Sequence, residues 1–257
     1  MLFRLDPQTL VLLIPALIFA LSFHEYAHAW VAYRLGDNTA ARMGRLTLNP
    51  MAHLDPMGSM MILFVGFGWA KPVPVDPRSL NDPRTDMMKV AAAGPLANFI
   101  LAFSGGMILR LLSGTNLLTE TMLVMLLYFI QINIALAVFN LIPIAPLDGS
   151  QIFSGYLART NPGLAWKIQT YGPQVLFGLI LLGYLTNFSI IWMIMRPFVN
   201  FFMLLFAGIS IRPEMSYFKR LLPQRIKKVR STWWLLGMLI GIIYLIYHLK
   251  NIASEGF

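Results

Sequence analysis

Cysteine is absent from the 257-residue sequence. The chain therefore forms no disulfide bond and offers no thiolate as a zinc ligand. A metal ion bound by this protein has to be held by histidine, aspartate or glutamate side chains, and the sequence contains only 4 His and 11 acidic residues. These few positions limit where a metal site can be built.

Charged residues are also scarce, at 12% of the chain, whereas 57% of the residues are hydrophobic. A soluble domain is about a quarter charged. No long polar stretch is available to fold as a separate soluble module, so we expect one membrane-embedded domain over residues 1–257. The first apolar run continues into a polar motif at His24, and we therefore expect no cleavable signal peptide.

Six apolar segments approach the length of about 17–25 residues that is needed to cross a bilayer. They are 8–33, 88–112, 121–142, 171–188, 189–210 and 232–249. The sequence thus predicts an all-α polytopic membrane protein with about six transmembrane helices. Within the fifth segment, Arg196-Pro197 indicates either a break in the helix or a turn at the membrane interface.

Positive charge is concentrated in three of the connecting segments. The connections 34–87, 143–170 and 211–231, with Lys89 counted in the first, carry 16 of the 20 Lys and Arg residues. Positive residues favour the cytoplasmic side of a cell membrane, so we expect these loops in the cytoplasm and both termini on the other face. Because the charge lies beside apolar segments, the net charge of +9 does not indicate a nucleic-acid partner.

The most informative motif is the run from His24 to His28, an H-E-x-x-H in the second half of the first apolar segment. Residues four apart lie on one face of a helix, so both imidazoles can bind a single zinc ion. Glu25, one position along, can then act as a general base toward a water molecule. The alternative is a pair of packing histidines with an unrelated glutamate, but three ionisable groups inside a membrane helix are costly unless they act together.

Asp148 is the only acidic residue between Glu120 and Glu214. It follows the proline-rich break that ends the third apolar segment, and it falls on the same side of the membrane as His28 in the expected topology. A catalytic zinc ion takes three protein ligands, and two histidines leave it one short, so Asp148 is the candidate for the third. Taken alone, Asp148 would instead predict the N-cap of a following helix.

Three further polar residues are candidates for substrate binding. Asn98 lies in the second apolar segment, where an amide either bonds to a neighbouring helix or lines a cavity and holds the substrate backbone. Asn140 ends the third segment and would present its amide to the same cavity as Asp148. His53 could hold substrate or donate a hydrogen bond to a developing oxyanion, or it could be an interfacial histidine.

The segment 42–75 does not have the pattern of a spanning helix, because glycine and proline interrupt it repeatedly. Its longest apolar run, 60–65, is too short to cross a bilayer and predicts a strand or a re-entrant loop. We therefore expect a re-entrant or β-like loop between the first two transmembrane helices, with an extended edge that can pair with a substrate strand. The alternative is an ordinary amphipathic connector.

Three motifs together resemble the signature elements of the site-2 protease family of intramembrane zinc metalloproteases. They are HEYAH in an apolar helix, GPLAN at the start of a later one and NLIPIAPLDG at the end of the next, in the order found in that family. The stretches HLDPMG and FGWAKPVPV resemble its compact prokaryotic branch, so we expect neither a PDZ module nor a CBS-type domain. The match covers about residues 8–155 as a catalytic core and leaves about 156–257 as accessory helices.

The resemblance implies one zinc ion per chain and assigns it to His24, His28 and Asp148, with Glu25 as the base. It also suggests that the two asparagines of these motifs, Asn98 and Asn140, position substrate. Family members cleave membrane-anchored proteins within or near their transmembrane segments, in some cases as the second cut of a signalling cascade. The resemblance therefore implies a multi-pass protease of the cell membrane whose active site lies near the cytoplasmic side.

Two other functions remain open from the sequence. A membrane metal-ion transporter would use the same His and Asp ligands but would leave Glu25 without a role. A scaffold that binds membrane helices is suggested by Gly237-x-x-x-Gly241, a pattern that also fits ordinary helix packing or a homodimer.

Overall fold

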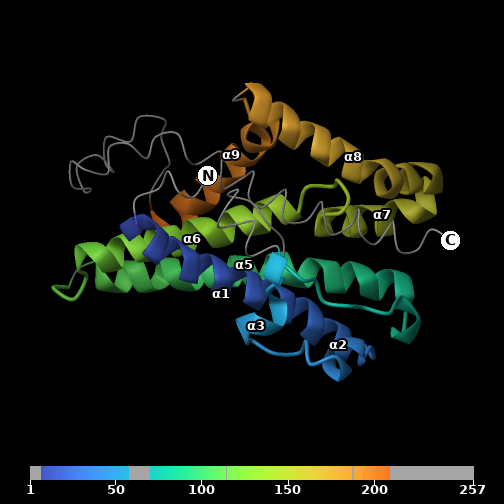
Figure 1. Ribbon diagram of the computed structural model, residues 1–257, viewed down its shortest axis with the longest axis horizontal. Coiled ribbons are helices and arrows are strands. Elements are labelled where there is room, and N and C mark those ends of the chain that lie inside the picture. Colours follow the sequence, from blue (N-terminus) through green and yellow to red (C-terminus); the bar gives the residue numbers. More distant parts are fainter. Residues whose placement is uncertain (1–6, 58–69, 114, 187, 209–257) are drawn as a thin grey trace.

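The computed structural model describes residues 7–57, 70–113, 115–186 and 188–208. Across these residues the secondary structure is helical, apart from one isolated antiparallel bridge between Leu54 and Ala70. The helices, shown in Figure 1, are α1 (Pro7–Arg34), α2 (Thr39–Arg42), α3 (Pro50–His53), the short 3-10 helix η2 (Pro77–Ser79), α5 (Pro83–Leu112), α6 (Glu120–Asn140), α7 (Asp148–Thr160), α8 (Pro162–Thr186) and α9 (Ile190–Ala207).

Four of the helices are long and apolar enough to cross a membrane: Leu10–Arg34 of α1, and the whole of α5, α6 and α9. These helices confirm the all-α membrane fold and correspond to four of the six predicted spans. The predicted span 171–188 lies mostly in α8, which is not among the four. The predicted span 232–249 lies outside the described residues, so the count of six stays a prediction.

Side-chain caps explain where several helices begin. Asp82 accepts a hydrogen bond from the backbone N–H of Thr85, and Pro83 occupies the first position of α5, where its missing N–H costs nothing. Hydrogen bonds from the side chain and backbone of Thr85 lower the pKa of the Asp82 carboxyl below its ordinary value. Thr119 and Ser189 cap α6 and α9 in the same way.

Helix α9 is continuous through Arg196 and Pro197. The break or interfacial turn predicted at this pair is therefore absent, and the proline is accommodated inside the helix, as membrane helices tolerate. The helix ends at Gly208, whose φ of 71° is the left-handed conformation that favours glycine.

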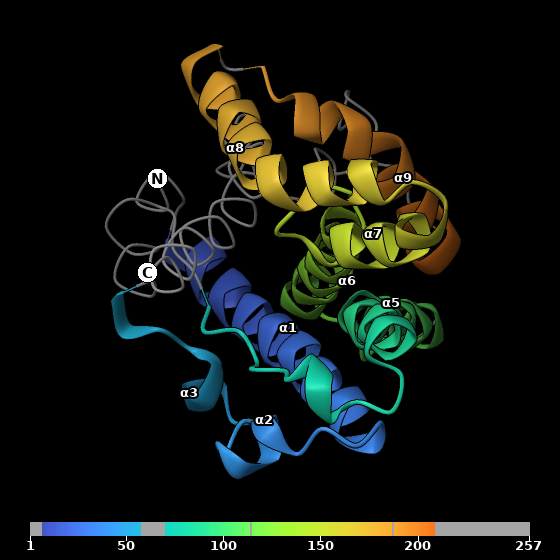
Figure 2. The same cartoon turned by 90° about the vertical axis from the view of Figure 1, so that its right-hand side faces the viewer.

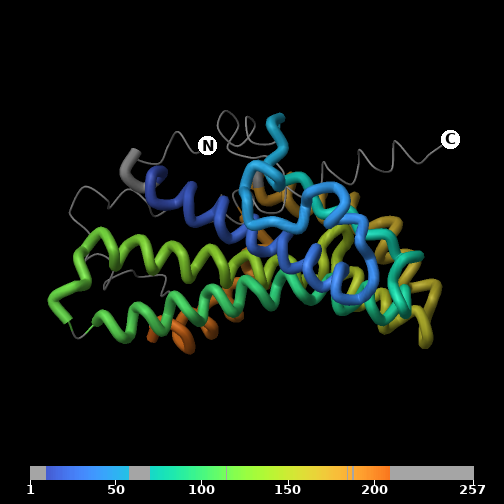
Figure 3. The backbone as a smooth tube through the Cα atoms, turned by 90° about the horizontal axis from the view of Figure 1, so that it is seen from below, coloured from blue at the N-terminus to red at the C-terminus, as the bar shows by residue number. Residues whose placement is uncertain are grey.

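Helix α6 lies at the centre of the bundle. Over residues 127–140 every side chain except that of Phe129 is buried. Helix α5 runs beside α6, and α1 lies against both (Figure 3). Figure 2 shows α7, α8 and α9 on one side of this group, and α2 and α3 on the other side, next to α1. Buried apolar side chains of α1, α5, α6, α8 and α9 form one core.

The outer faces of the spanning helices carry large exposed apolar side chains. Ile100 and Phe103 on α5 and Phe201 on α9 are each more than half exposed. Apolar surface of this extent is unfavourable in water and favourable against lipid tails. A buried central helix, α6, and apolar side chains on the outer faces of α5 and α9 are the arrangement expected of a protein surrounded by lipid.

The expected re-entrant loop falls largely on residues 58–69, which lie outside the described residues. On either side of this gap the chain comes together, since Leu54 bridges to Ala70 and the N–H of Lys71 donates to the carbonyl of His53 at 2.8 Å. Residues 71–76 then run without helix toward η2. The β-like character of the loop stays a prediction.

Candidate metal centre

The H-E-x-x-H residues lie on α1, within the segment that is long enough to span a membrane. The helix places the imidazoles of His24 and His28 on one face, with their Nε2 atoms 3.0 Å apart. Both rings are buried, and Glu25 between them in the sequence is only 2% exposed. Burial of three ionisable side chains requires specific partners for each of them.

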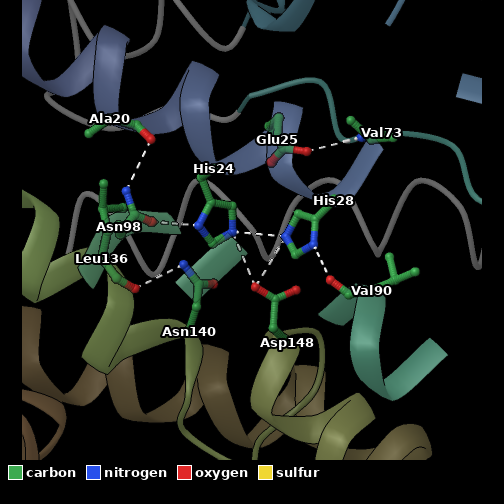
Figure 4. Close-up of polar contacts among 10 residues, drawn as sticks. All are labelled: Ala20, His24, Glu25, His28, Val73, Val90, Asn98, Leu136, Asn140 and Asp148. Atoms are coloured by element: carbon green, nitrogen blue, oxygen red, sulfur yellow. Dashed lines mark hydrogen bonds and ion pairs between the residues drawn. The ribbon is translucent and has the colours of Figure 1, made fainter. Parts of the chain in front are cut away.

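Hydrogen bonds set the orientation and the tautomer of each imidazole (Figure 4). Nδ1 of His24 lies 2.6 Å from Oδ1 of Asn98, whose amide nitrogen donates to two other oxygens. Nδ1 of His28 lies 2.7 Å from the carbonyl oxygen of Val90. Because both acceptors are oxygens, each Nδ1 carries the proton and donates it. Each Nε2 therefore presents a lone pair toward the other.

Asp148 brings the third donor atom from far along the chain. It is the first residue of α7, and its Oδ2 lies 3.1 Å from Nε2 of His24 and 3.4 Å from Nε2 of His28. This oxygen is buried and accepts no hydrogen bond from the part of the chain that the structure describes. The N-cap position of α7 is occupied by Leu147, so the alternative role of Asp148 as a helix cap does not hold.

The three atoms form a site that suits a zinc ion. Their separations of 3.0, 3.1 and 3.4 Å are close to the edge of about 3.3 Å expected for a tetrahedron with bonds of about 2.05 Å to zinc. Three such atoms this close to one another repel unless a positive charge, either a proton or a metal ion, lies among them. Two nitrogens and a carboxylate oxygen are a donor set that zinc commonly takes.

Gly94 on α5 keeps space open beside both imidazoles. A Cβ atom at this position would meet the Nε2 atoms of His28 and His24 far inside van der Waals contact. The backbone of α5 can therefore approach the metal-facing edges of the rings only because residue 94 has no side chain. The donor set, the lone pairs and this space all fit a metal ion.

Glu25 lies next to the donor group without belonging to it. Its Oε2 accepts a hydrogen bond of 3.1 Å from the backbone N–H of Val73, in the extended segment that follows the gap (Figure 4). A buried carboxylate that neither binds the metal nor forms an ion pair in this group is available for proton transfer.

The two asparagines predicted to bind substrate have different surroundings. Asn98 is fully buried, and its carboxamide bonds to His24, Asn133 and a backbone carbonyl of α1, so the bond to neighbouring helices is the alternative that is present. The amide nitrogen of Asn140 donates to the carbonyl of Leu136 at 3.1 Å, but its buried Oδ1 has no hydrogen-bond partner within residues 7–57, 70–113, 115–186 and 188–208. Substrate binding by either residue stays a prediction.

His53 is also almost fully buried, with 1% of its surface exposed. Its Nε2 lies 2.8 Å from the carbonyl of Thr47, and its Nδ1 lies 3.5 Å from a guanidinium nitrogen of Arg45. Both ring nitrogens thus face protein groups. The structure supports a role in holding the loop, and the predicted contact with substrate stays a prediction.

Sequence reasoning missed several groups that shape this centre. Asn133 supports Asn98, Val90 orients His28, and the N–H of Val73 binds Glu25. Val90 and Val73 take part through backbone groups alone, so their residue types do not indicate these contacts. Asn133 did carry a signal, because an amide in the middle of an apolar helix needs a polar partner.

Comparison with known proteins agrees with these features. The family described as Peptidase family M50 matches residues 12–122 and 105–183, which is more than half of the chain. The chain belongs to peptidase family M50. This membership confirms the resemblance to the site-2 proteases that the three motifs predicted, and the group of His24, His28 and Asp148 agrees with a metalloprotease.

Individual members of the M50 family show how far the similarity extends. "Putative zinc metalloprotease YwhC" of Bacillus subtilis is 44% identical over 168 residues, which cover 62% of this chain and 75% of that protein. "Putative zinc metalloprotease Rip2" of Mycobacterium tuberculosis is 33% identical over 151 residues, 54% of each chain. The chain thus spans about half the length of the Rip2 protein that it matches. No solved structure gives a significant match.

Proposed function

We propose that this M50 metalloprotease hydrolyses peptide bonds within or near the transmembrane segments of membrane-anchored proteins. The proposal rests on one observation: the donor group of His24, His28 and Asp148, together with the buried Glu25, lies on and against a helix long enough to span the membrane. A soluble substrate would have to reach this depth, whereas a membrane-anchored one is already there.

We assign the zinc ion to Nε2 of His24, Nε2 of His28 and Oδ2 of Asp148. When bound, zinc supplies Lewis acidity, which polarises the scissile carbonyl and allows a water molecule to act as nucleophile near neutral pH. Asn98 and the carbonyl of Val90 hold the two imidazoles in the tautomer that leaves each Nε2 free to bind metal.

Glu25 performs the proton transfers. Its carboxylate accepts a proton from the attacking water as the oxygen bonds to the scissile carbonyl carbon. The same carboxyl group then delivers that proton to the amide nitrogen as the carbon–nitrogen bond breaks. The products are a carboxylic acid and an amine, which together hold all the atoms of the peptide and the water, so no other proton donor is required.

Asn140 and residues 71–75 are the groups that we assign to the substrate backbone. A helical substrate hides its amides in internal hydrogen bonds, so it has to unwind locally before cleavage. The unpaired Oδ1 of Asn140 can then accept a backbone N–H of the unwound segment. The extended edge of residues 71–75 provides backbone groups for pairing with a substrate strand.

The expected topology places this chemistry near the cytoplasmic face of the cell membrane. His28 lies six residues before Arg34, the last residue of α1, which corresponds to about 9 Å along the helix axis. Arg34 begins the first of the basic connections that favour the cytoplasm. Residues 1–257 would then act as one metalloprotease domain, with the core at about 8–155 and the remaining helices as accessory elements. A role in regulated intramembrane proteolysis follows if the substrate is a membrane-anchored signalling protein.

The purified protein in proteoliposomes with a single-pass membrane substrate provides the test. We expect zinc-dependent cleavage that a chelator abolishes and that Glu25→Gln lowers by about 100- to 10,000-fold, with zinc content unchanged. Cleavage at the wild-type rate by Glu25→Gln would overturn the assignment of the base. Zinc flux across the vesicle membrane without peptide cleavage would instead establish the transporter.

A further inference from the structure

The segment from Lys71 to Asp76 passes over Glu25 as a short extended chain with a proline on each side of Val73. Pro72 and Pro74 have no N–H, so Val73 supplies the only backbone donor among residues 72–74. Each proline also restricts the residue before it to extended conformations. The N–H that donates to Oε2 of Glu25 is therefore presented by a stiff piece of backbone.

Asp37 fixes one end of this segment. Its Oδ2 accepts the backbone N–H of Asp76 at 2.8 Å, and its Oδ1 accepts the N–H of Thr39 at 2.9 Å. The side chain of Asp37 is 0% exposed, and its own N–H donates to the carbonyl of Ala32 on α1. The helix that carries Glu25 is thus connected through Asp37 to the segment that binds Glu25.

The other end is fixed by two further buried residues. The N–H of Lys71 donates to the carbonyl of His53, and the guanidinium of Arg45 donates to the carbonyl of Lys71. Arg45 and His53 are 4% and 1% exposed. The buried side chains of Asp37 and Arg45, with the backbone carbonyl of His53, therefore hold a segment that contains no catalytic side chain. Burying two charged side chains for this purpose is costly unless the placement of the segment's backbone matters.

We propose that Asp37 is a positioning residue for Glu25 and acts through the backbone of residues 71–76. This inference rests on the assignment of Glu25 as the base. Val73 lies three residues from Asp76, about 10 Å along an extended chain, so loss of the bond at Asp76 frees the Val73 N–H to move. A displacement of about 1 Å in a reacting group can cost about 100-fold in rate.

The first arm of the test removes the donor itself. Val73→Pro deletes the N–H, and Asp76→Asn is the control, because it lies outside residues 71–75 and keeps every backbone N–H of the segment. We expect Val73→Pro to lower kcat by about 10- to 100-fold, with KM within about twofold of wild type and the zinc content unchanged. Equal kcat values for Val73→Pro and Asp76→Asn would overturn the proposal.

The second arm asks whether Asp37 acts through the same bond. Asp37→Asn can accept only one of the two N–H groups, while Asp76→Asn keeps the backbone N–H that Asp37 binds. We expect kcat to fall in Asp37→Asn but not in Asp76→Asn. The double variant of Asp37→Asn with Val73→Pro should be no slower than Val73→Pro alone, whereas multiplied losses would contradict the coupling.

Amide hydrogen exchange, measured on the zinc-loaded protein without substrate, tests the coupling between Asp37 and the Val73 N–H. Glu25→Ala should increase exchange at Val73 alone, and Asp37→Asn should increase it at both Val73 and Asp76. Unchanged exchange at Val73 in Asp37→Asn would overturn the proposal even if the protein is a protease. The expected exchange pattern in a protein that cleaves no membrane substrate would leave the coupling intact and reject the proposed function.

Discussion

At the scale of single residues, the metal centre depends on where protons are placed. His24 and His28 both donate from Nδ1, to an amide oxygen and to a backbone carbonyl, and so turn lone pairs toward Oδ2 of Asp148. A change of tautomer does not relieve the repulsion, because Nδ1 would then present a lone pair to an oxygen, so a proton or a metal ion has to supply positive charge among the three atoms. A bound metal ion replaces the repulsion among the three donor atoms with attraction to its positive charge.

A methyl group at residue 94 should prevent metal binding. Gly94→Ala places a Cβ against both Nε2 atoms, so we expect the zinc content of the purified protein to fall from about one ion per chain to a small fraction of that. Gly178→Ala is the matched control, since its Cβ on α8 would meet nothing within 4 Å. Metal analysis of both variants checks the prediction, and full zinc occupancy in Gly94→Ala would show that the ion binds elsewhere.

Loss of the amide that orients His24 should weaken zinc binding without abolishing it. Removing such a partner of a ligand typically costs about 10- to 100-fold in metal affinity, and we expect this for Asn98→Ala in a titration against a competing chelator. Asn133→Ala should shift the affinity in the same direction by less, because it contacts Asn98 and not the histidine. A larger shift for Asn133→Ala than for Asn98→Ala would contradict this order.

At the scale of secondary structure elements, the third ligand depends on how α7 is held. Nε2 of Gln169 on α8 lies within hydrogen-bonding distance of the hydroxyls of Ser150 and Ser154 and of the carbonyl of Ser150. Gly172 lies so close to Ala145 that a Cβ there would clash with its backbone. Helix α8, beyond the core expected from the sequence, thus supports the helix that begins with Asp148.

Replacement of Gln169 should therefore destabilise the protein and loosen Asp148. Gln169→Ala leaves the buried hydroxyls of Ser150 and Ser154 without this donor, and we expect the free energy of unfolding to fall by about 1–2 kcal/mol. Gln174→Ala, at an exposed position of the same helix, is the control for the loss of a glutamine side chain alone. Denaturant unfolding in detergent micelles measures both variants, and equal stabilities would show that the contact to α7 contributes nothing.

At the scale of the whole molecule, the sequence was informative where the chemistry is local. The spacing of His24 and His28 specifies one face of one helix, and Asp148 stands out because acids are rare in this chain. The contacts made by Gly94, Asn133 and the N–H of Val73 arise only when helices far apart in sequence pack together. Neither periodicity nor residue type determines which backbone group meets which side chain, so these contacts required the structure.

Zinc should stabilise the whole bundle because it joins α1 to α7 through residues 24, 28 and 148. A ligand that binds only the folded state at a concentration of 100 Kd adds about 2.7 kcal/mol to the free energy of unfolding. Chelation should therefore lower the Tm of the wild type by several degrees. Glu25→Gln keeps all three ligands and should show the same fall. Asp148→Ala should have a low Tm that chelation does not lower further, and a fall equal to that of the wild type would mean that Asp148 is not a ligand.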